Sequence, residues 1–419
     1  MSNILILFTK KYPYGNGEEF IQAELGFHLS SFNRIIVVSC QADKSSKKTK
    51  ITPSNIQIAK IVGDNTRFRY LRYFLLGLKF INDTDLNEEL KSANTFKSKV
   101  AAIYYYGKMQ KIFTSCVSVL KNLKLDSQDN IVLYSYWFFD ITHVAILLKK
   151  KFFADYKCSV VTRAHGFDLY EYRSPSNNIP FRKWCLKNID EVFTCSIDGS
   201  NYLKIMYPDF SNKISVSYLG TNDFGMAEFS KGSSFHLVTC SWLAPLKRVD
   251  LVASALKTLI DKGVTNIHWT CIGTGTLLKK LKNYSKRNLA NISVDFLGQL
   301  SNSNVHNFYA HNNIDVFLNV SSTEGLPVSI MEAQSYGIPS IATDVGGTRE
   351  IVINNCTGRI VPADLTPSQL AVEIQNWINI ASDENFKIRI NCRKFWETHF
   401  NSSINYLAFS QQIQNKTKR

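Results

Sequence analysis

The chain has 419 residues, of which 45% are hydrophobic, and it carries a formal net charge of +15. This length suits two domains of ordinary size, and the composition is typical of a globular protein. No run of about 18 apolar residues occurs, so a transmembrane helix is not expected.

The positive charge favours anionic partners. Lys and Arg number 49 against 34 Asp and Glu, and such a surface attracts nucleotide sugars, nucleic acid or anionic lipid. None of the known nucleic-acid-binding motifs is visible in the sequence, which speaks against nucleic acid. Charge alone does not choose between the other two classes.

The cysteines and the first residues indicate the compartment. Nine cysteines are scattered along the chain and form no Cys-x-x-Cys pair, which argues against a disulfide framework and a structural zinc site. Residues 1–8 lack a basic start and a small-residue cleavage site, so they predict a buried strand rather than a signal peptide. We therefore expect a cytoplasmic protein.

A glycine-containing loop over residues 10–20 follows this first strand and opens a helix. Gly15 and Gly17 allow a tight turn and a close approach of the backbone to a ligand. Such a turn is common, so by itself it indicates little. Apolar runs predict further strands at 34–39, 131–137, 158–162, 191–195 and 214–220, with a helix at 198–206.

Residues 45–125 are polar, basic and weakly patterned, and we expect mainly helices there. Within them, residues 67–79 mix basic and aromatic side chains at helical spacing. This stretch suits a helix on a membrane surface. The alternative is a packed helix with a solvated Arg/Lys rim, which we favour because a basic helix face is usually just solvated.

His165 comes directly after the strand predicted at 158–162. In open α/β sheets this is where ligands bind. A single histidine at a strand end is more often structural, so both interpretations stay open, as does a role for the neighbouring Asp168.

The second half of the chain begins a new α/β pattern. Residues 223–234 contain glycines and little apolar pattern, so they predict a linker between an N-terminal domain, 1–222, and a C-terminal domain, 235–395. After a strand near residue 268, the sequence has a Gly-x-Gly turn at Gly273. It lacks the third glycine and the downstream acid of a dinucleotide fingerprint, so a nicotinamide site is not indicated.

The densest group of signals lies between residues 316 and 347. It predicts a strand, a polar loop, a helix starting at Pro327 and a second strand at 340–343, which together form a parallel right-handed unit. The helix start offers unpaired N–H groups to a phosphate at Gly325, Leu326, Pro327 and Val328.

Two carboxylates flank this helix start. Glu324 precedes it and Glu332 lies further along the helix. Carboxylate oxygens accept hydrogen bonds from hydroxyl groups, and two oxygens can serve a vicinal diol. The plain alternative is ordinary helix-dipole chemistry, because acidic residues are common near helix starts.

The wider context of these carboxylates resembles a known signature. Glu324-Gly-Leu-Pro-Val-Ser-Ile-Met-Glu-Ala333, followed by Gly337-Ile-Pro and Cys356-Thr-Gly-Arg-Ile-Val-Pro362, is similar to the motif of retaining glycosyltransferases of family 4. The resemblance implies an α/β GT-B fold, in which two Rossmann-like domains face each other across a cleft. It also implies that residues 396–419 form a helix returning to the N-terminal domain and a frayed tail.

The resemblance assigns roles to individual residues. Lys247 matches a lysine that holds the donor diphosphate, but Trp242 stands where the family has an arginine, and Arg248 stands where a glycine is usual. Whether Arg248 replaces the missing arginine is open. Gly273 and Gln299 match positions beside the nucleotide, and Gly15 and Gly17 match the loop that borders the donor phosphates.

The implied reaction is sugar transfer from a nucleotide-diphosphate sugar, UDP- or GDP-linked, with retention at the anomeric carbon. Glu324 would orient the sugar hydroxyls, Glu332 the ribose, and His165 the sugar from the N-terminal domain. Lys247 and the N–H groups near Gly325 would stabilise the leaving diphosphate. No metal site and no cofactor are expected.

The acceptor would be a growing glycan or a lipid-linked precursor of a capsular polysaccharide, exopolysaccharide or O-antigen, at the inner face of the cytoplasmic membrane. Front-side attack and double displacement both stay open for the mechanism. Two other functions compete with transfer. One is a nucleotide-sugar epimerase of the same architecture, and the other is a basic binding protein without activity.

Overall fold

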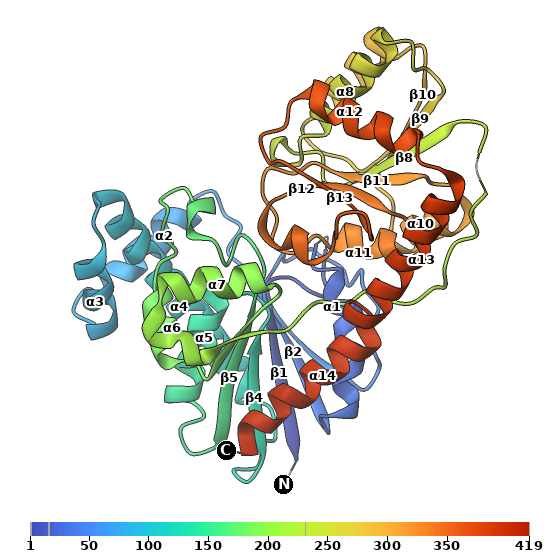
Figure 1. Cartoon of the computed structure of the whole chain (residues 1–419). Helices are drawn as coiled ribbons and strands as arrows, with labels where there is room; N and C mark the ends of the chain where they lie inside the picture. The colour runs from blue at the N-terminus through green and yellow to red at the C-terminus, as the bar shows by residue number, and fades with distance from the viewer. Residues whose placement is uncertain (1, 16, 231, 419) are drawn as a thin grey trace. The chain divides into compact units, whose positions relative to one another are not determined.

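The computed structural model describes residues 2–15, 17–230 and 232–418. The chain divides into two compact units, Met1–Tyr218 with Ser403–Arg419 (unit 1) and Leu219–Ser402 (unit 2). Each unit contains one parallel β-sheet with helices packed on it (Figure 1). The predicted α/β class with two parallel-sheet domains is therefore confirmed.

Unit 1 is built on a seven-stranded sheet of order β3-β2-β1-β4-β5-β6-β7. Its central strands are buried on both faces, as parallel strands covered by helices must be, and they therefore have nearly continuous apolar sequences. The strands are β1 (Asn3–Thr9), β2 (Arg34–Ala42), β3 (Gln57–Val62), β4 (Asn130–Ser135), β5 (Lys157–Ala164), β6 (Glu191–Thr194) and β7 (Ile214–Val216).

Helices cover the two faces of this sheet separately. Side chains of α4, α5, α6 and α7 join one apolar core, and those of α1 and α14 join another on the opposite face. The helices are α1 (Phe20–Leu25), η1 (Gly26–Ser30), α2 (Arg69–Leu78), α3 (Thr84–Ser92), α4 (Phe96–Leu120), α5 (Asp140–Lys151), η2 (Glu171–Arg173), α6 (Arg182–Asn188), α7 (Ile197–Met206), η3 (Pro208–Lys213), α14 (Ser402–Gln414) and η6 (Asn415–Lys418).

Residues 45–125 are mainly helical, as predicted, but they also contain the strand β3. This strand lies at the edge of the sheet and only Ile61 in it is buried, so it lacks the apolar run by which a strand is recognised. Residues 415–418, expected to fray, form η6, and Lys416 pairs with Glu191. Arg419 lies outside the described residues.

Unit 2 is built on a six-stranded sheet of order β10-β9-β8-β11-β12-β13. Its strands are β8 (Phe235–Cys240), β9 (Ile267–Ile272), β10 (Ser293–Gly298), β11 (Val316–Asn319), β12 (Ser340–Thr343) and β13 (Gly358–Val361). Its helices are η4 (Pro245–Lys247), α8 (Val249–Asp261), α9 (Leu278–Asn288), α10 (Asn302–His311), α11 (Val328–Ser335), η5 (Gly346–Glu350), α12 (Pro367–Ile378) and α13 (Ser382–His399).

The predicted strand–helix–strand unit is present as β11, α11 and β12, which pair in parallel. The helix begins at Val328, one residue later than predicted, and Pro327 is the preceding cap residue with an extended backbone. The segment predicted as a linker contains no helix or strand in its described residues, 223–230 and 232–234. Its Ala227 N–H donates to the carbonyl of Tyr336 within unit 2.

Both sheets have a point at which the strand order reverses. In unit 1, β1 lies between β2 and β4, and in unit 2, β8 lies between β9 and β11. The loops after the two strands flanking such a point turn to opposite faces of the sheet, and open α/β sheets bind ligands there. The loops after β1 and β4, and those after β8 and β11, are therefore where a site is expected.

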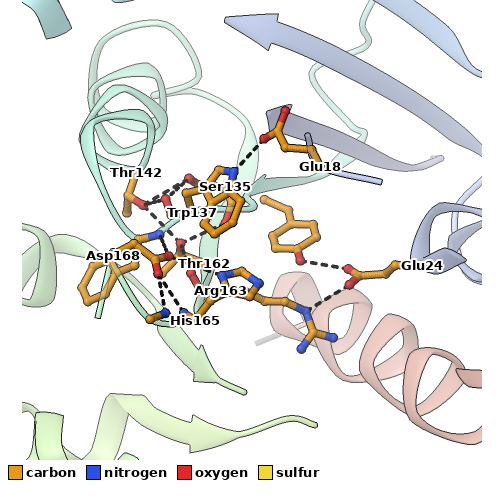
Figure 2. A network of polar contacts seen from close by, with 12 residues as sticks. Glu18, Glu24, Ser135, Trp137, Thr142, Thr162, Arg163, His165 and Asp168 are labelled. Atoms are coloured by element: carbon orange, nitrogen blue, oxygen red, sulfur yellow. Dashed lines mark hydrogen bonds and ion pairs between the residues drawn. The ribbon is translucent and has the colours of Figure 1, made fainter. Parts of the chain in front are cut away.

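A buried charged network joins β5 to α1 in unit 1 (Figure 2), and α14 packs against it. Arg163 of β5 pairs with Glu24 of α1, Nε to Oε2, over 3.2 Å, and its guanidinium lies 3.8 Å from the ring centre of Phe409. Tyr134 donates to the same carboxylate over 2.8 Å. Burial would raise the pKa of Glu24, but Arg163, His28 and Tyr134 together outweigh burial and lower it.

Replacing Phe409 should therefore weaken unit 1. Phe409 is 1% exposed, and its ring contacts Tyr134 and Phe193. We expect Phe409→Ala to lower the free energy of unfolding by about 3 kcal/mol, because it leaves a cavity and removes the apolar cover of a buried guanidinium. Urea unfolding measures this. Ile404→Ala, on the same helix but 54% exposed, is the control, and equal losses in both variants would contradict the assignment.

Candidate active site

In unit 2, the loops after β8 and β11 are joined by an ion pair. Nζ of Lys247, at the end of η4, donates to Oε1 of Glu324 over 2.6 Å. Nδ2 of Asn319 lies 3.3 Å from the same oxygen and donates to it. The side chains of Lys247 and Glu324 are 23% and 11% exposed, so Lys247 is not simply a solvated lysine at a helix end.

The same two loops are also joined through their backbones. The N–H of Ser322 donates to the carbonyl of Leu246 over 2.8 Å. Nε of Arg248 donates to the carbonyl of Val320 over 2.7 Å. The reversal point of the sheet is thus bridged by hydrogen bonds as well as by the ion pair, so its shape does not depend on the ion pair alone.

Arg248 has the backbone conformation that explains why a glycine is usual at its position. Its φ of +46° and ψ of +35° lie in the left-handed region, which glycine adopts without strain. Its Nη2 is buried and has no hydrogen-bond partner among the residues that the structure describes. Trp242, at the arginine position of the resembled family, is 59% exposed. Arg248 therefore has a donor available at the reversal point.

The loop after β12 supports Glu324 from behind. Gly346 has a φ of +52°, and a Cβ there would lie 2.1 Å from the carbonyl oxygen of Glu324. The N–H of Gly347 donates to the carbonyl of Gly325 over 2.8 Å. A larger residue at position 346 would displace the loop that carries the carboxylate, so this glycine is required by packing.

The start of α11 lies directly after this loop. No side chain of the described residues caps it. The N–H of Ile330 donates to the carbonyl of Pro327 over 3.1 Å, so the N–H groups of Val328 and Ser329 are the ones that can meet an anion. Pro327 has no N–H and cannot contribute one. Leu326 and Pro327 are buried, and Gly325 and Val328 are half-buried. The helix start at which the phosphate site is predicted thus begins one residue later, at Val328.

Glu332 occupies a separate, nearly buried position on α11. Its side chain is 14% exposed, accepts from Nδ2 of Asn302 over 2.9 Å and lies 3.9 Å from Nε2 of His306. Burial raises the pKa of Glu332 to about 7, with the Asn302 hydrogen bond acting in the opposite direction. Burial also lowers the pKa of His306 to about 4, so a neutral His306 does not keep the carboxylate ionised.

The Gly-x-Gly turn after β9 packs directly against the backbone of the loop after β8, which leaves no room for a side chain. A Cβ at Gly273 would lie 1.9 Å from the carbonyl oxygen of Ser241, and one at Gly275 would lie 2.6 Å from that of Leu243. The Gly273 N–H donates to the carbonyl of Gly298 over 2.7 Å. The next residue, Gln299, is exposed. Both predicted residues thus lie at the carboxyl ends of β9 and β10, on the same edge of the sheet as Lys247.

In unit 1, Asp168 holds the loop that carries His165 (Figure 2). Its Oδ1 accepts from the backbone N–H groups of His165 and Gly166 over 2.9 and 3.0 Å. Its Oδ2 accepts from the N–H of Phe138 over 3.0 Å and lies 3.4 Å from Nδ1 of His165. Asp168, whose role was open, is therefore the residue that orients the histidine.

The imidazole of His165 is enclosed by aromatic rings. It stacks on Tyr136 with ring centres 4.8 Å apart and lies 4.6 Å from Trp137. Burial would lower the pKa of His165, but Cys195 and the Asp168 carboxylate outweigh burial and raise it above its usual value. The enclosed ring therefore tends to carry a positive charge.

The loops after β1 and β4 are also joined across their reversal point. Nε1 of Trp137 donates to Oε1 of Glu18 over 2.6 Å. The Glu18 carboxylate also accepts from the backbone N–H groups of Lys10, Lys11 and Tyr12 over 3.0, 2.7 and 2.7 Å. Glu18 thus fixes the course of the loop after β1.

The predicted glycines of this loop have the expected freedom. Gly15 and Gly17 have φ of +64° and +89°, and no atom lies within 4 Å of a Cβ built on either. Asn16 between them lies outside the described residues. Thr49 Oγ1 and Lys50 Nζ donate to the carbonyl of Gly15 over 2.6 and 2.5 Å. The turn is strained for other residues but borders open space.

Sequence reasoning missed the partners of the predicted residues. Asn319 and Asn302 donate to the two site carboxylates, and Glu18 and Trp137 join the loops in unit 1. Only Asn319, five residues before Glu324 in the same segment, was close enough to be suspected. The others come from distant parts of the chain, and nothing in their local sequence signals a contact.

The part of the chain that the structure describes contains neither a metal-ligand cluster nor a membrane-spanning helix. No group of three or more His, Cys, Asp or Glu residues is arranged to hold a metal ion. Within residues 2–15, 17–230 and 232–418, no helix combines the length and apolar character needed to cross a membrane.

Most of unit 2 is similar in sequence to a known protein family. Residues 228–394 match the family "Glycosyl transferases group 1". The matched segment makes up most of unit 2. The predicted resemblance is thereby confirmed at the level of group 1 glycosyltransferases.

Curated relatives of this group 1 domain are glycosyltransferases. The uncharacterized glycosyltransferase MJ1178 of Methanocaldococcus jannaschii is 28% identical over 262 residues, 62% of this chain and 68% of that protein. The GtfA subunit of a Streptococcus agalactiae UDP-N-acetylglucosamine–peptide N-acetylglucosaminyltransferase is 29% identical over 36% of this chain and 29% of its own length. The Escherichia coli O-antigen biosynthesis glycosyltransferase WbnH is 34% identical over 26% of this chain. The match spans only 28% of WbnH.

Solved structures resemble the whole chain. Anabaena Alr3699/HepE in complex with UDP has a TM-score of 0.70 at 15% identity, covering 99% of this chain and 100% of that chain. Sucrose-phosphate synthase from Thermosynechococcus elongatus has a TM-score of 0.73 at 15% identity, covering 99% and 98%. At this identity the similarity establishes the fold, which is the GT-B fold, and nothing finer.

The raised pKa of Glu332 predicts a pH dependence of stability. Because its pKa of about 7 in the folded chain exceeds the unfolded value of about 4.3, its favourable contribution is fully present below about pH 4.3 and is lost as pH rises through 7. The unfolding free energy of the wild type should therefore fall by about 2 kcal/mol more than that of Glu332→Gln between pH 5 and 8.

Urea unfolding at both pH values measures this difference. Glu397→Gln, which changes a carboxylate 47% exposed, corrects for the loss of a charge as such. A difference between the wild type and Glu332→Gln that is constant with pH would contradict the predicted burial effect.

Proposed function

We propose that the protein is a retaining glycosyltransferase of family 4, which moves a hexosyl group from a nucleotide-diphosphate sugar to a growing glycan or a lipid-linked acceptor. The observation that carries this proposal is the Lys247–Glu324 pair at the reversal point between β8 and β11, beside the uncapped start of α11. It lies in the segment that matches group 1. This arrangement combines a cation, hydrogen-bond donors and a carboxylate at one helix start.

The diphosphate would bind to Lys247, Arg248 and the first-turn N–H groups of α11. Cleavage of the bond between the anomeric carbon and the phosphate oxygen leaves negative charge on the diphosphate, and fixed donors stabilise it as it develops. The unpartnered Nη2 of Arg248 supplies the donor that Trp242 cannot. Arg248 thus takes the place of the family arginine. These groups also supply the positive charge for which other transferases use a metal, so we propose a metal-independent reaction without a cofactor.

The two carboxylates would bind hydroxyl groups. Glu324 already accepts from two donors, and it would orient the hydroxyls of the transferred sugar. Glu332 would accept both hydroxyls of the ribose, which requires its ionised form. Since free Glu332 has a pKa of about 7, the diol would bind with release of a proton near neutral pH.

His165 would position the sugar. Its ring is fixed by Asp168 and enclosed by Tyr136 and Trp137, so it offers a defined donor rather than a mobile one. The loop with Gly15 and Gly17 would border the donor phosphates. For the chemical step we propose front-side attack, in which the acceptor oxygen bonds to the anomeric carbon, the phosphate leaves, and the phosphate takes the proton of the acceptor.

The comparisons favour UDP as the nucleotide and a surface polysaccharide as the product. A HepE structure holds UDP and glucose, and relatives take part in O-antigen and colanic acid biosynthesis. We propose UDP-linked donors first and GDP-linked donors second for this chain. An acceptor on a lipid carrier places the reaction in the cytoplasm at the inner face of the membrane.

Nucleotide binding tests the donor site. In thermal denaturation against a panel of nucleotide diphosphates and their sugars, one nucleotide at a hundred times its Kd should add about 2.7 kcal/mol of stability. The gain should disappear in Lys247→Ala and Glu332→Gln. Lys257→Ala, which removes an ion-paired lysine of α8, is the control and should keep it. A gain that survives in both site variants would place the nucleotide elsewhere.

Transfer itself is tested with the stabilising nucleotide sugar and lipid-linked or oligosaccharide acceptors. We expect NMR of the product to show the anomeric configuration of the donor, with the rate unchanged by EDTA and lowered about a hundredfold in Lys247→Ala. An inverted product or an absolute metal requirement would contradict the proposal. A new nucleotide sugar formed without any acceptor would identify an epimerase instead.

A further inference from the structure

Helix α2 of unit 1 is fixed by its inner face. Tyr73 and Gly77 are buried against α4. A Cβ at Gly77 would lie 2.0 Å from the carbonyl oxygen of Ile103, and one at Gly107 would lie 2.0 Å from that of Tyr73. The two backbones are therefore in direct contact, and only glycine permits this. The favoured interpretation of residues 67–79 as a packed helix is correct for this face.

The outer face of α2 is apolar and exposed. Four side chains form what we call the outer stripe, and they are Phe68, Leu71, Leu75 and Leu78, which are 66%, 56%, 50% and 39% exposed. Their spacing of three, four and three residues places them on one side of the helix. A packed amphipathic helix turns such a stripe inward, whereas here glycine and tyrosine face inward. Single exposed apolar residues are ordinary, but a continuous stripe indicates a partner.

Basic residues border the outer stripe. Residues 67–79 contain four of them, Arg67, Arg69, Arg72 and Lys79, and no acidic residue. Arg72 and Lys79 follow Phe68 and Leu75 by four residues, so they lie beside the stripe on the same side of the helix. Arg72 pairs with Asp64 over 3.0 Å, so most of the net positive charge of the border comes from the other three. Long basic side chains can keep their charge in an aqueous head-group layer while the apolar residues between them are buried.

We propose that the outer stripe and its basic border dock unit 1 on an anionic membrane surface, with α2 lying in the plane of the interface. An apolar stripe bordered by cations fits a bilayer whose acyl region lies under anionic head groups. A second copy fits less well, because two such faces in a symmetric contact would bring their cations together. The inference deepens the proposed function, since a lipid-linked acceptor would be met at that surface, but its geometry does not involve the donor site.

Vesicle flotation tests the proposal. The full-length protein should float with vesicles of phosphatidylglycerol and phosphatidylcholine at low salt, and much less with phosphatidylcholine alone or in 0.5 M NaCl, where charges are screened. The double variant Leu71→Ser with Leu75→Ser should partition at least about tenfold less onto the anionic vesicles, because it interrupts the stripe without touching Tyr73 or Gly77.

A matched control and a charge variant separate the contribution of the outer stripe from that of exposed apolar residues in general and from that of charge. Ile205→Ser with Ile404→Ser replaces two apolar residues of unit 1 that are 78% and 54% exposed, and it should float like the wild type. Arg67→Gln with Lys79→Gln should reduce the preference for anionic over neutral vesicles. Equal flotation of the stripe variant and the wild type would overturn the proposal. So would a dimer of the wild type, seen by light scattering, that the stripe variant abolishes.

Failure here is distinguishable from failure of the proposed function. The stripe variant should keep the same thermal stabilisation by nucleotide as the wild type, because α2 belongs to unit 1 and the proposed nucleotide site to unit 2. Loss of flotation with intact nucleotide binding supports the docking surface. Intact flotation in a protein that responds to no nucleotide would overturn only the proposed function.

Discussion

In each unit, one carboxylate connects the two loops that flank the reversal point of the sheet. The chain segments that follow these two strands turn toward opposite faces of the sheet, so the two loops separate unless a side chain connects them. In unit 1, Glu18 holds both the backbone of the loop after β1 and the indole of Trp137. In unit 2, Glu324 holds Lys247. The remaining site residues are arranged around these two contacts.

The two carboxylates differ in how much hydrogen-bonding capacity they leave for a ligand. Glu18 is consumed by four donors, which is the pattern of a carboxylate that maintains a loop. Glu324 and Lys247 are a pair beside an uncapped helix start, and both can exchange partners when an anion and a hydroxyl arrive. Glu332 has only one amide donor and is partly protonated at neutral pH. Unit 2 therefore carries the incompletely satisfied polar groups that a ligand can complete.

Helix α2 illustrates a different constraint. Its contact with α4 requires two glycines at the point where the backbones meet, so apart from Tyr73 the large apolar side chains have little room on the inner face. Those side chains therefore lie outside, where their exposure is costly unless a second phase or partner covers them. The close packing of α2 on α4 and the exposure of the outer stripe thus have the same cause, the glycine contact between the two helices.

Sequence patterns predicted the class of fold, which the structure confirms, and they proposed where the site lies. Apolar runs ending at polar loops identified most strands, because parallel strands buried on both faces are apolar at nearly every position rather than at every second one. The edge strand β3 was missed for the same reason, since only Ile61 in it is buried. Glu324 and Glu332 were predicted from one motif, because a helix start and its flanking acids are contiguous in the chain, whereas Lys247 was assigned by the family resemblance alone.

The partners of these residues follow from contacts between distant parts of the chain. The pairing of Lys247 with Glu324 spans 77 positions and that of Trp137 with Glu18 spans 119, so no local pattern encodes either. Burial, which raises the pKa of Glu332, is likewise a property of the assembled unit. The direction of the α2 stripe also required the structure, because periodicity shows that a helix has an apolar face but not whether that face is covered.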